Sequence, residues 1–77
     1  MVKIPSDNSM IEVQLAHEKS EWAYAVYVMG PNGCLYSNRY EYDADKPGDQ
    51  GRARRDARHR YDRTQYEYPG CNVYDES

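Results

Sequence analysis

The feature that most constrains the fold is the apolar run WAYAVYVM at residues 22–29, which is followed directly by the turn sequence GPNG at residues 30–33. Aromatic and β-branched residues favour extended chain. Pro31 presets the backbone angle of a first turn position, and Gly33 can adopt the left-handed conformation of a bulged turn. The pattern therefore predicts a β-hairpin that runs from 22–29 into 34–42.

A further strand precedes this hairpin. Ile11, Val13 and Leu15 occupy every second position of residues 11–17, which is the period of a strand with one buried face. A polar break at residues 18–21 separates this segment from the apolar run. The alternation predicts a three-stranded antiparallel meander.

Turn lengths predict the register, because a one-residue slip would send every side chain to the wrong face. A three-residue loop at 31–33 pairs Tyr24 with Tyr40, and a four-residue loop at 18–21 pairs Leu15 with Tyr24. The two hairpins then agree on one buried face, formed by Ile11, Val13, Leu15, Trp22, Tyr24, Val26, Val28, Tyr36, Tyr40 and Tyr42. The second face is mixed and carries Glu12, Gln14, Ala16, Ala23, Ala25, Tyr27, Met29, Leu35, Ser37, Arg39 and Glu41.

A helix is expected from residue 50 to about residue 63. Its apolar side chains, Ala53, Ala57 and Tyr61, recur every four residues and make one narrow stripe that can lie close to the sheet. Asp45 or Asp49 is the expected capping carboxylate. After a Pro-Gly turn at 69–70, residues 72–74 either add a short strand or lie across an edge of the sheet.

Composition supports a single small domain over residues 1–77 of the α+β class, a three-stranded antiparallel sheet packed by one helix. The 77 residues hold only nine Ile, Leu and Val and no Phe, but nine Tyr and one Trp make up for them, and a net charge of −3 is too small to indicate disorder. Residues 1–10 lack the apolar stretch of a signal peptide, and no run is long enough to span a membrane. A cytoplasmic protein is expected.

Charge is unevenly distributed along the chain. Residues 52–63 hold six Arg against two Asp, a balance of +4, while the rest of the chain has a balance of −7. An exposed helix is ordinarily charged, yet six Arg and no Lys also suit forked contacts with phosphates or carboxylates. Nine tyrosines exceed what one helix can cover, so some are expected at contacts. The predicted partner-contact residues are Tyr27, Arg52, Arg55, Arg58, Tyr66, Glu67, Tyr68, Tyr74, Asp75 and Glu76.

No pattern of a catalytic, metal or cofactor site is present. His17 and His59 lack a nucleophile or paired acid at a useful spacing, and no C-x-x-C or H-x-x-x-H motif supports zinc binding. Cys34 and Cys71 either form a disulfide or remain two structural thiols. We therefore expect a protein that is not an enzyme and holds no cofactor or metal.

A very short, acidic, aromatic-rich α+β chain without a catalytic motif resembles the small phage-encoded inhibitors, anti-CRISPR proteins among them. The resemblance implies a protein that blocks a host defence or nucleic-acid-handling complex by occupying a site on it. It transfers no role to individual residues.

Two other functions remain open. The Arg-rich helix would bind nucleic acid through Arg52, Arg55 and Arg58, with an affinity that falls steeply with salt. Alternatively, the half-apolar second face would make the chain a homodimeric structural protein. That dimer interface would comprise Ala23, Ala25, Tyr27, Met29 and Leu35.

Overall fold

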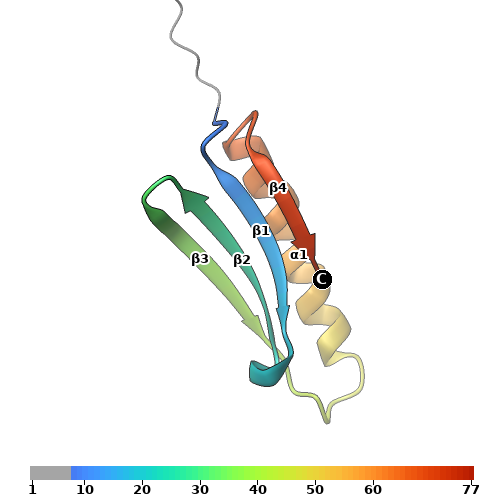
Figure 1. The fold of residues 1–77 in the computed structure, drawn as a ribbon. Helices are drawn as coiled ribbons and strands as arrows, with labels where there is room; N and C mark the ends of the chain where they lie inside the picture. The colour runs from blue at the N-terminus through green and yellow to red at the C-terminus, as the bar shows by residue number, and fades with distance from the viewer. Residues whose placement is uncertain (1–7) are drawn as a thin grey trace, which may run out of the picture.

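The computed structural model describes residues 8–77. The expectation that residues 1–10 form no signal peptide therefore falls mostly on residues outside the described part. Four strands and one helix make an α+β fold (Figure 1), as predicted. The elements are β1 (Glu12–Glu18), the 3-10 turn η1 (Lys19–Glu21), β2 (Ala23–Gly30), β3 (Gly33–Glu41), α1 (Asp49–Glu67) and β4 (Asn72–Glu76).

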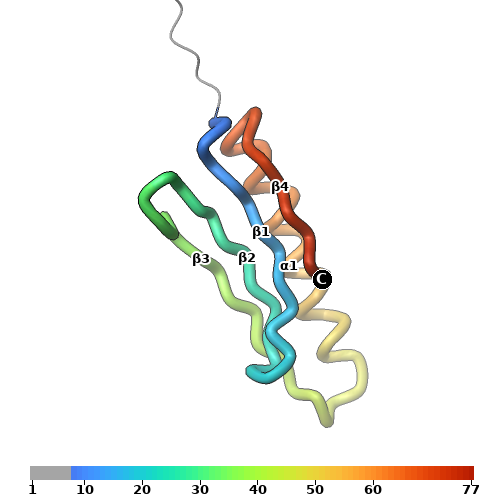
Figure 2. The backbone as a smooth tube through the Cα atoms, in the orientation of Figure 1, coloured from blue at the N-terminus to red at the C-terminus, as the bar shows by residue number. Residues whose placement is uncertain are grey.

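The sheet has the strand order β3-β2-β1-β4 and is mixed, because β1, β2 and β3 form the predicted antiparallel meander while β4 pairs with β1 in parallel. The backbone trace in Figure 2 shows why: the chain leaves β3, returns along α1 and re-enters the sheet beside β1. Of the two expected positions for the C-terminal segment, the structure has the added strand.

The first hairpin is two residues out of the predicted register. Val13 pairs with Val28 and Leu15 with Val26, whereas the prediction paired Leu15 with Tyr24. The reason is the turn: β1 and β2 stay paired as far as Glu18 and Ala23, and η1 with the following residue closes the loop. A shift of two leaves every side chain on its predicted face, because the strand period is two.

The second hairpin confirms the predicted pairs Tyr24–Tyr40 and Val28–Tyr36. Its loop is shorter than predicted, however, since Gly30 pairs with Gly33 and only residues 31–32 lie between them. The register shifts by one between the turn and Tyr36, which is a β-bulge.

Two residues of the predicted buried face are exposed instead. Trp22 lies between η1 and β2 in a left-handed conformation, with φ 53° and ψ 53°. Its side chain is therefore 55% exposed and does not join the buried face. Tyr36 is 37% exposed, and its hydroxyl donates to Glu67, the last residue of α1, at 3.2 Å. Tyr36 therefore lies at the end of the helix, where the cover over the sheet stops.

The core lies between α1 and the sheet face that the alternation predicted. It is built from Val13, Leu15, Tyr24, Val26, Tyr42, Ala53, Ala57 and Tyr61. Ala53 and Ala57 are fully buried, so the small stripe of α1 lies close against the sheet, as predicted. Aromatic side chains supply much of the apolar area that the aliphatic residues lack.

Helix α1 has different ends from those predicted. It begins at Asp49 and ends at Glu67, and the buried Thr64 extends the core-facing stripe because its hydroxyl donates to the Arg60 carbonyl at 2.7 Å. The predicted carboxylate cap is wrong, since the N-cap is Gly48 in a left-handed conformation. Among residues 8–77, no helix has the length and apolar character needed to cross a membrane.

Candidate functional site

The sheet face opposite α1 is uncovered by any other element of residues 8–77. Because side chains alternate between faces, the residues between the core positions point to this side. We call it the acidic face, and it includes Glu21, whose carboxylate reaches it from η1. The acidic face comprises Glu12, Gln14, Ala16, Glu18, Glu21, Ala23, Ala25, Tyr27, Met29, Ser37, Arg39, Glu41, Asn72, Tyr74 and Glu76.

Arg39 is the centre of an ion-pair cluster on the acidic face. Its guanidinium lies 2.7 Å from the Glu21 carboxylate, 3.1 Å from that of Glu41 and 3.2 Å from that of Glu18. Hydrogen bonds to Glu21 first, and then to Glu41, raise the pKa of Arg39. Three carboxylates thus share one guanidinium, which leaves the cluster negative.

The cluster also explains why small residues stand at the middle of this face. Glu18 and Glu41 pair with Ala23 from its two sides, and Arg39 pairs with Ala25. The ion pairs therefore bridge the flanking strands across the two alanines, which are at most 2% exposed. A homodimer through Ala23 and Ala25 would first have to open these contacts.

Two tyrosines of the predicted contact set share one row of the acidic face. Tyr27 and Tyr74 flank Gln14 on either side in the register. The Tyr27 hydroxyl donates to Glu18, and this bond together with burial raises the pKa of Tyr27 to about 12. The Tyr74 hydroxyl donates to Glu76 at 3.2 Å, which raises the pKa of Tyr74. Both phenols are neutral at pH 7 and lie beside carboxylates.

The charge on this face follows directly from its residues. Five carboxylates stand against the single guanidinium of Arg39, which gives a local charge of −4. The carboxylates belong to Glu12, Glu18, Glu21, Glu41 and Glu76. Strands hold four of them on a regular grid, with neighbouring strands about 4.8 Å apart, and η1 holds Glu21. The face therefore presents fixed negative charge together with two tyrosine rings.

The predicted arginines of α1 are divided between structural and free roles. Arg52 pairs with Asp49 at 2.9 Å and Asp56 at 3.1 Å, so it holds the first turns of the helix. Arg58 pairs with Asp75 at 2.6 Å and ties α1 to β4. Within residues 8–77, Arg55 has no carboxylate in ion-pair range.

The end of α1 carries the other predicted contact residues, away from the acidic face. Tyr66 is 85% exposed, Glu67 accepts the Tyr36 hydroxyl, and Tyr68 is half-buried just after the helix. The structure therefore brings Tyr27, Tyr74 and Glu76 together but leaves Tyr66, Glu67 and Tyr68 at a separate place.

Sequence reasoning named Tyr27, Tyr74 and Glu76 as contact residues, but it missed the other charged residues of the acidic face, Glu12, Glu18, Glu21, Arg39 and Glu41. The alternation placed Glu12, Arg39 and Glu41 on this side, and that parity was the available signal. It could not show that Glu18 and Glu21 reach the same guanidinium, because this contact depends on how the first turn folds.

The described residues also bear on a metal site and on the two cysteines. No three His, Cys, Asp or Glu side chains gather in residues 8–77 in a way that could hold a metal ion. Cys34 is exposed and Cys71 half-buried, and both are free thiols. Comparison of the chain with family models, with curated proteins and with solved structures finds no match.

Proposed function

We propose that this chain is a non-enzymatic inhibitor of phage or mobile-element origin, whose acidic face occupies a basic surface on a host protein or ribonucleoprotein complex. The observation that carries the proposal is the uncovered sheet face with a local charge of −4 around Tyr27 and Tyr74. A target of this charge would be a surface that ordinarily binds nucleic acid.

Two physical properties support binding through this face. Fixed carboxylates on a sheet attract a basic surface as phosphates do, and charge complementarity sets association rate and specificity. Tyrosines supply large, rigid contact area with one polar handle, as in many interface hot spots. Half-exposed Tyr74 offers such a ring at the rim of the sheet.

Nucleic-acid binding by α1 has less support. Two of its three predicted arginines, Arg52 and Arg58, already hold acidic side chains of the same chain. Phosphate contact would therefore fall mainly to Arg55 and to neighbouring arginines of the helix.

Capture from a bacterial lysate tests the proposal. The immobilised chain is incubated with the lysate fraction that elutes from heparin, and the captured protein is then challenged with duplex DNA and with RNA. We expect a defined protein that nucleic acid releases, because both ligands would occupy one basic surface. Glu12→Gln combined with Glu76→Gln should weaken capture at least tenfold, because it removes two charges from the acidic face. These two carboxylates are chosen because they lie outside the Arg39 cluster, which the variant leaves intact.

The matched control removes the same charge elsewhere, with Asp45→Asn and Asp62→Asn. It should capture as the native chain does. Equal loss in both double variants would show a dependence on net charge alone, and capture that nucleic acid does not disturb would contradict the proposed target.

A further inference from the structure

Strand β3 is a free edge of the sheet. It stands at the end of the order β3-β2-β1-β4 and is nine residues long. Edge strands present unpaired backbone N–H and C=O groups that can pair with another extended chain. Residues 33–38 hold no charge and no proline, two features that commonly keep other strands from pairing with an edge. The β-bulge near the turn is therefore the main feature that hinders strand pairing on this half of β3. The edge is therefore open to an added strand.

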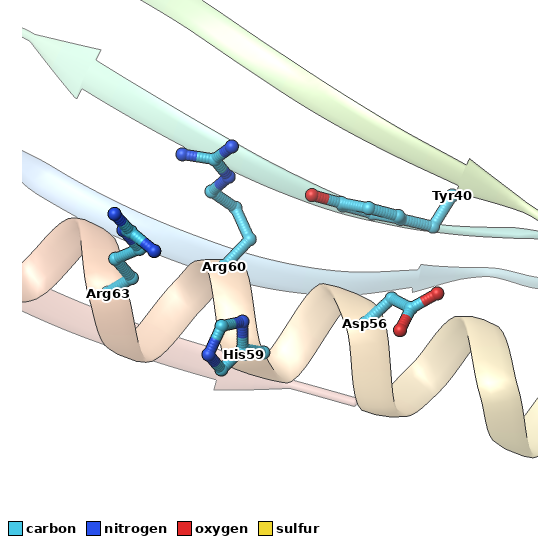
Figure 3. Close-up of a pocket in the computed structure, with 5 residues that line it drawn as sticks. All are labelled: Tyr40, Asp56, His59, Arg60 and Arg63. Carbon is cyan, nitrogen blue, oxygen red and sulfur yellow. The ribbon is translucent and has the colours of Figure 1, made fainter.

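A groove runs between this edge strand and α1. Its volume is about 240 Å³, and it is lined by Tyr40, Asp56, His59, Arg60 and Arg63. In Figure 3, Arg60 and Arg63 rise from the helix toward the strands, and the Tyr40 hydroxyl points toward Arg60. An extended chain beside β3 would place its helix-side side chains near these groups.

The groove has an excess of positive charge. The one acid in its lining, Asp56, pairs with Arg52 at 3.1 Å. Neither Arg60 nor Arg63 has a carboxylate within 4.0 Å among residues 8–77. A side-chain hydrogen bond with Tyr40, followed by electrostatic interaction with the same residue, raises the pKa of Arg60. Both guanidinium groups are therefore available to an anionic partner.

A second polar group near the groove lacks a partner. Asn38 lies two residues from Tyr40 on the same face of β3, opposite Val26, and its side-chain oxygen is buried without a hydrogen bond within the described residues. Because this oxygen is covered within the chain, it could accept a hydrogen bond from an added strand only if the Asn38 side chain turned outward.

We propose that the β3 edge binds an extended acidic segment of a partner protein. The segment adds a fifth strand beside β3 and turns alternate carboxylates toward Arg60 and Arg63. Backbone pairing supplies affinity in this mode, and the side chains on one face supply specificity. Forked contacts between guanidinium and carboxylate suit the two arginines. The site lies away from the acidic face and does not depend on the function proposed above.

A second copy of this chain fits the groove poorly. If two β3 strands paired with both helices on one side, the helix-facing residues of the added strand would be Tyr36, Asn38 and Tyr40. None of these carries a negative charge, and Glu41 would face the other side. Charge complementarity therefore favours an acidic segment of a different protein.

Calorimetric titration of the full chain with synthetic peptides tests the proposal. The probe is an eight-residue capped peptide that alternates Thr and Glu, and its match has Gln in place of Glu. We expect saturable binding of the Glu peptide and at least tenfold weaker binding of the Gln peptide. Arg60→Gln combined with Arg63→Gln should weaken binding of the Glu peptide at least tenfold.

Arg54→Gln combined with Arg55→Gln is the control, because it removes the same charge from α1 outside this groove. It should bind the Glu peptide within twofold of the native chain. The unfolding midpoint of each variant shows whether its fold is kept. The Gln peptide tests the charge requirement without any variant, because it is titrated into the native chain.

A third peptide tests the strand pairing. In this peptide, the backbone amides that would face β3 are methylated, and it should not bind. Separately, the unmodified Glu peptide should slow amide hydrogen exchange within β3 when it is bound. The proposal is overturned if the Glu peptide does not bind, if the Glu and Gln peptides bind equally, or if both arginine pairs matter equally. It is also overturned if only a single-stranded oligonucleotide binds through Arg60 and Arg63.

Discussion

Trp22 shows how one residue can depart from the pattern around it. Bulky residues rarely adopt a positive φ, yet the turn requires it here: the Trp22 N–H donates to the Lys19 carbonyl at 3.2 Å, and the Trp22 carbonyl accepts from Tyr42 at 2.9 Å. The indole meets the Tyr42 ring edge-on, with centroids 6.2 Å apart. The residue that begins the apolar run therefore closes a turn.

His17 is the other residue whose environment the sequence did not reveal. Its ring stacks on Tyr24 with centroids 4.2 Å apart, and its Nε2 lies 2.7 Å from the Tyr42 hydroxyl. Burial first, and then the positive charges of Lys19 and Arg54, lower the pKa of His17. The folded chain thus favours the neutral imidazole.

This lowered pKa predicts a loss of stability in mild acid. Below pH 6.5 the unfolded chain binds a proton at His17 more readily than the folded chain, so the His17 contribution is present above pH 6.5 and is lost as pH falls toward the lower folded pKa. His17→Phe keeps a stacking ring and removes the titration. Urea unfolding at pH 7.5 and pH 5.0 should show a smaller pH dependence for this variant than for the native chain.

His59→Phe provides the comparison for this measurement, because His59 is exposed on α1. It should retain the native pH dependence. An unchanged dependence in His17→Phe would contradict the role assigned to the half-buried ring.

At the scale of elements, α1 is positioned by small side chains and by its two ends. Ala53 and Ala57 allow close approach to the sheet, and Gly48 begins the helix with φ 85°. Asp49 does not cap the helix but accepts the Asp43 N–H at 2.7 Å and pairs with Arg52. These contacts fix where the helix starts after the β3–α1 loop.

Enlarging the small stripe should separate α1 from the sheet. Ala57→Leu adds three carbons at a side chain that is fully buried between α1 and the sheet. Overpacking of this kind costs about 1–3 kcal/mol of the free energy of unfolding. Denaturant unfolding should show this loss in the free energy of unfolding. Arg55→Leu adds a leucine to the exposed side of the same helix and should change it by less than about 0.5 kcal/mol; equal effects would contradict the close packing.

On the scale of the whole molecule, the net charge of −3 conceals a separation of charge between layers. The acidic face stands on one side of the sheet, and the Arg-rich helix covers the other. Opposite charges on the two layers are the basis of the two binding proposals made above, one for a basic partner and one for an acidic partner.

This charge arrangement predicts weak binding to nucleic acid. With duplex DNA or RNA in 0.15 M salt, we expect fluorescence anisotropy to show at most the affinity of non-specific contacts, with dissociation constants of about 10⁻⁴ M or weaker. Tighter binding that falls steeply with salt and is lost in Arg54→Gln with Arg55→Gln would instead support a nucleic-acid-binding helix.

The local pattern of residues determined the meander, the helix and the two faces of the sheet, because strand and helix periods repeat within a few residues and survive a register shift of two. Tyr24–Tyr40 pairing and the Ala53–Ala57 stripe were both predictable in this way. Tertiary structure alone decided the parallel place of β4, the exposure of Trp22 and the union of Glu18, Glu21 and Glu41 around Arg39. These features depend on contacts between residues distant in sequence or on the geometry of one turn, which no local periodicity encodes.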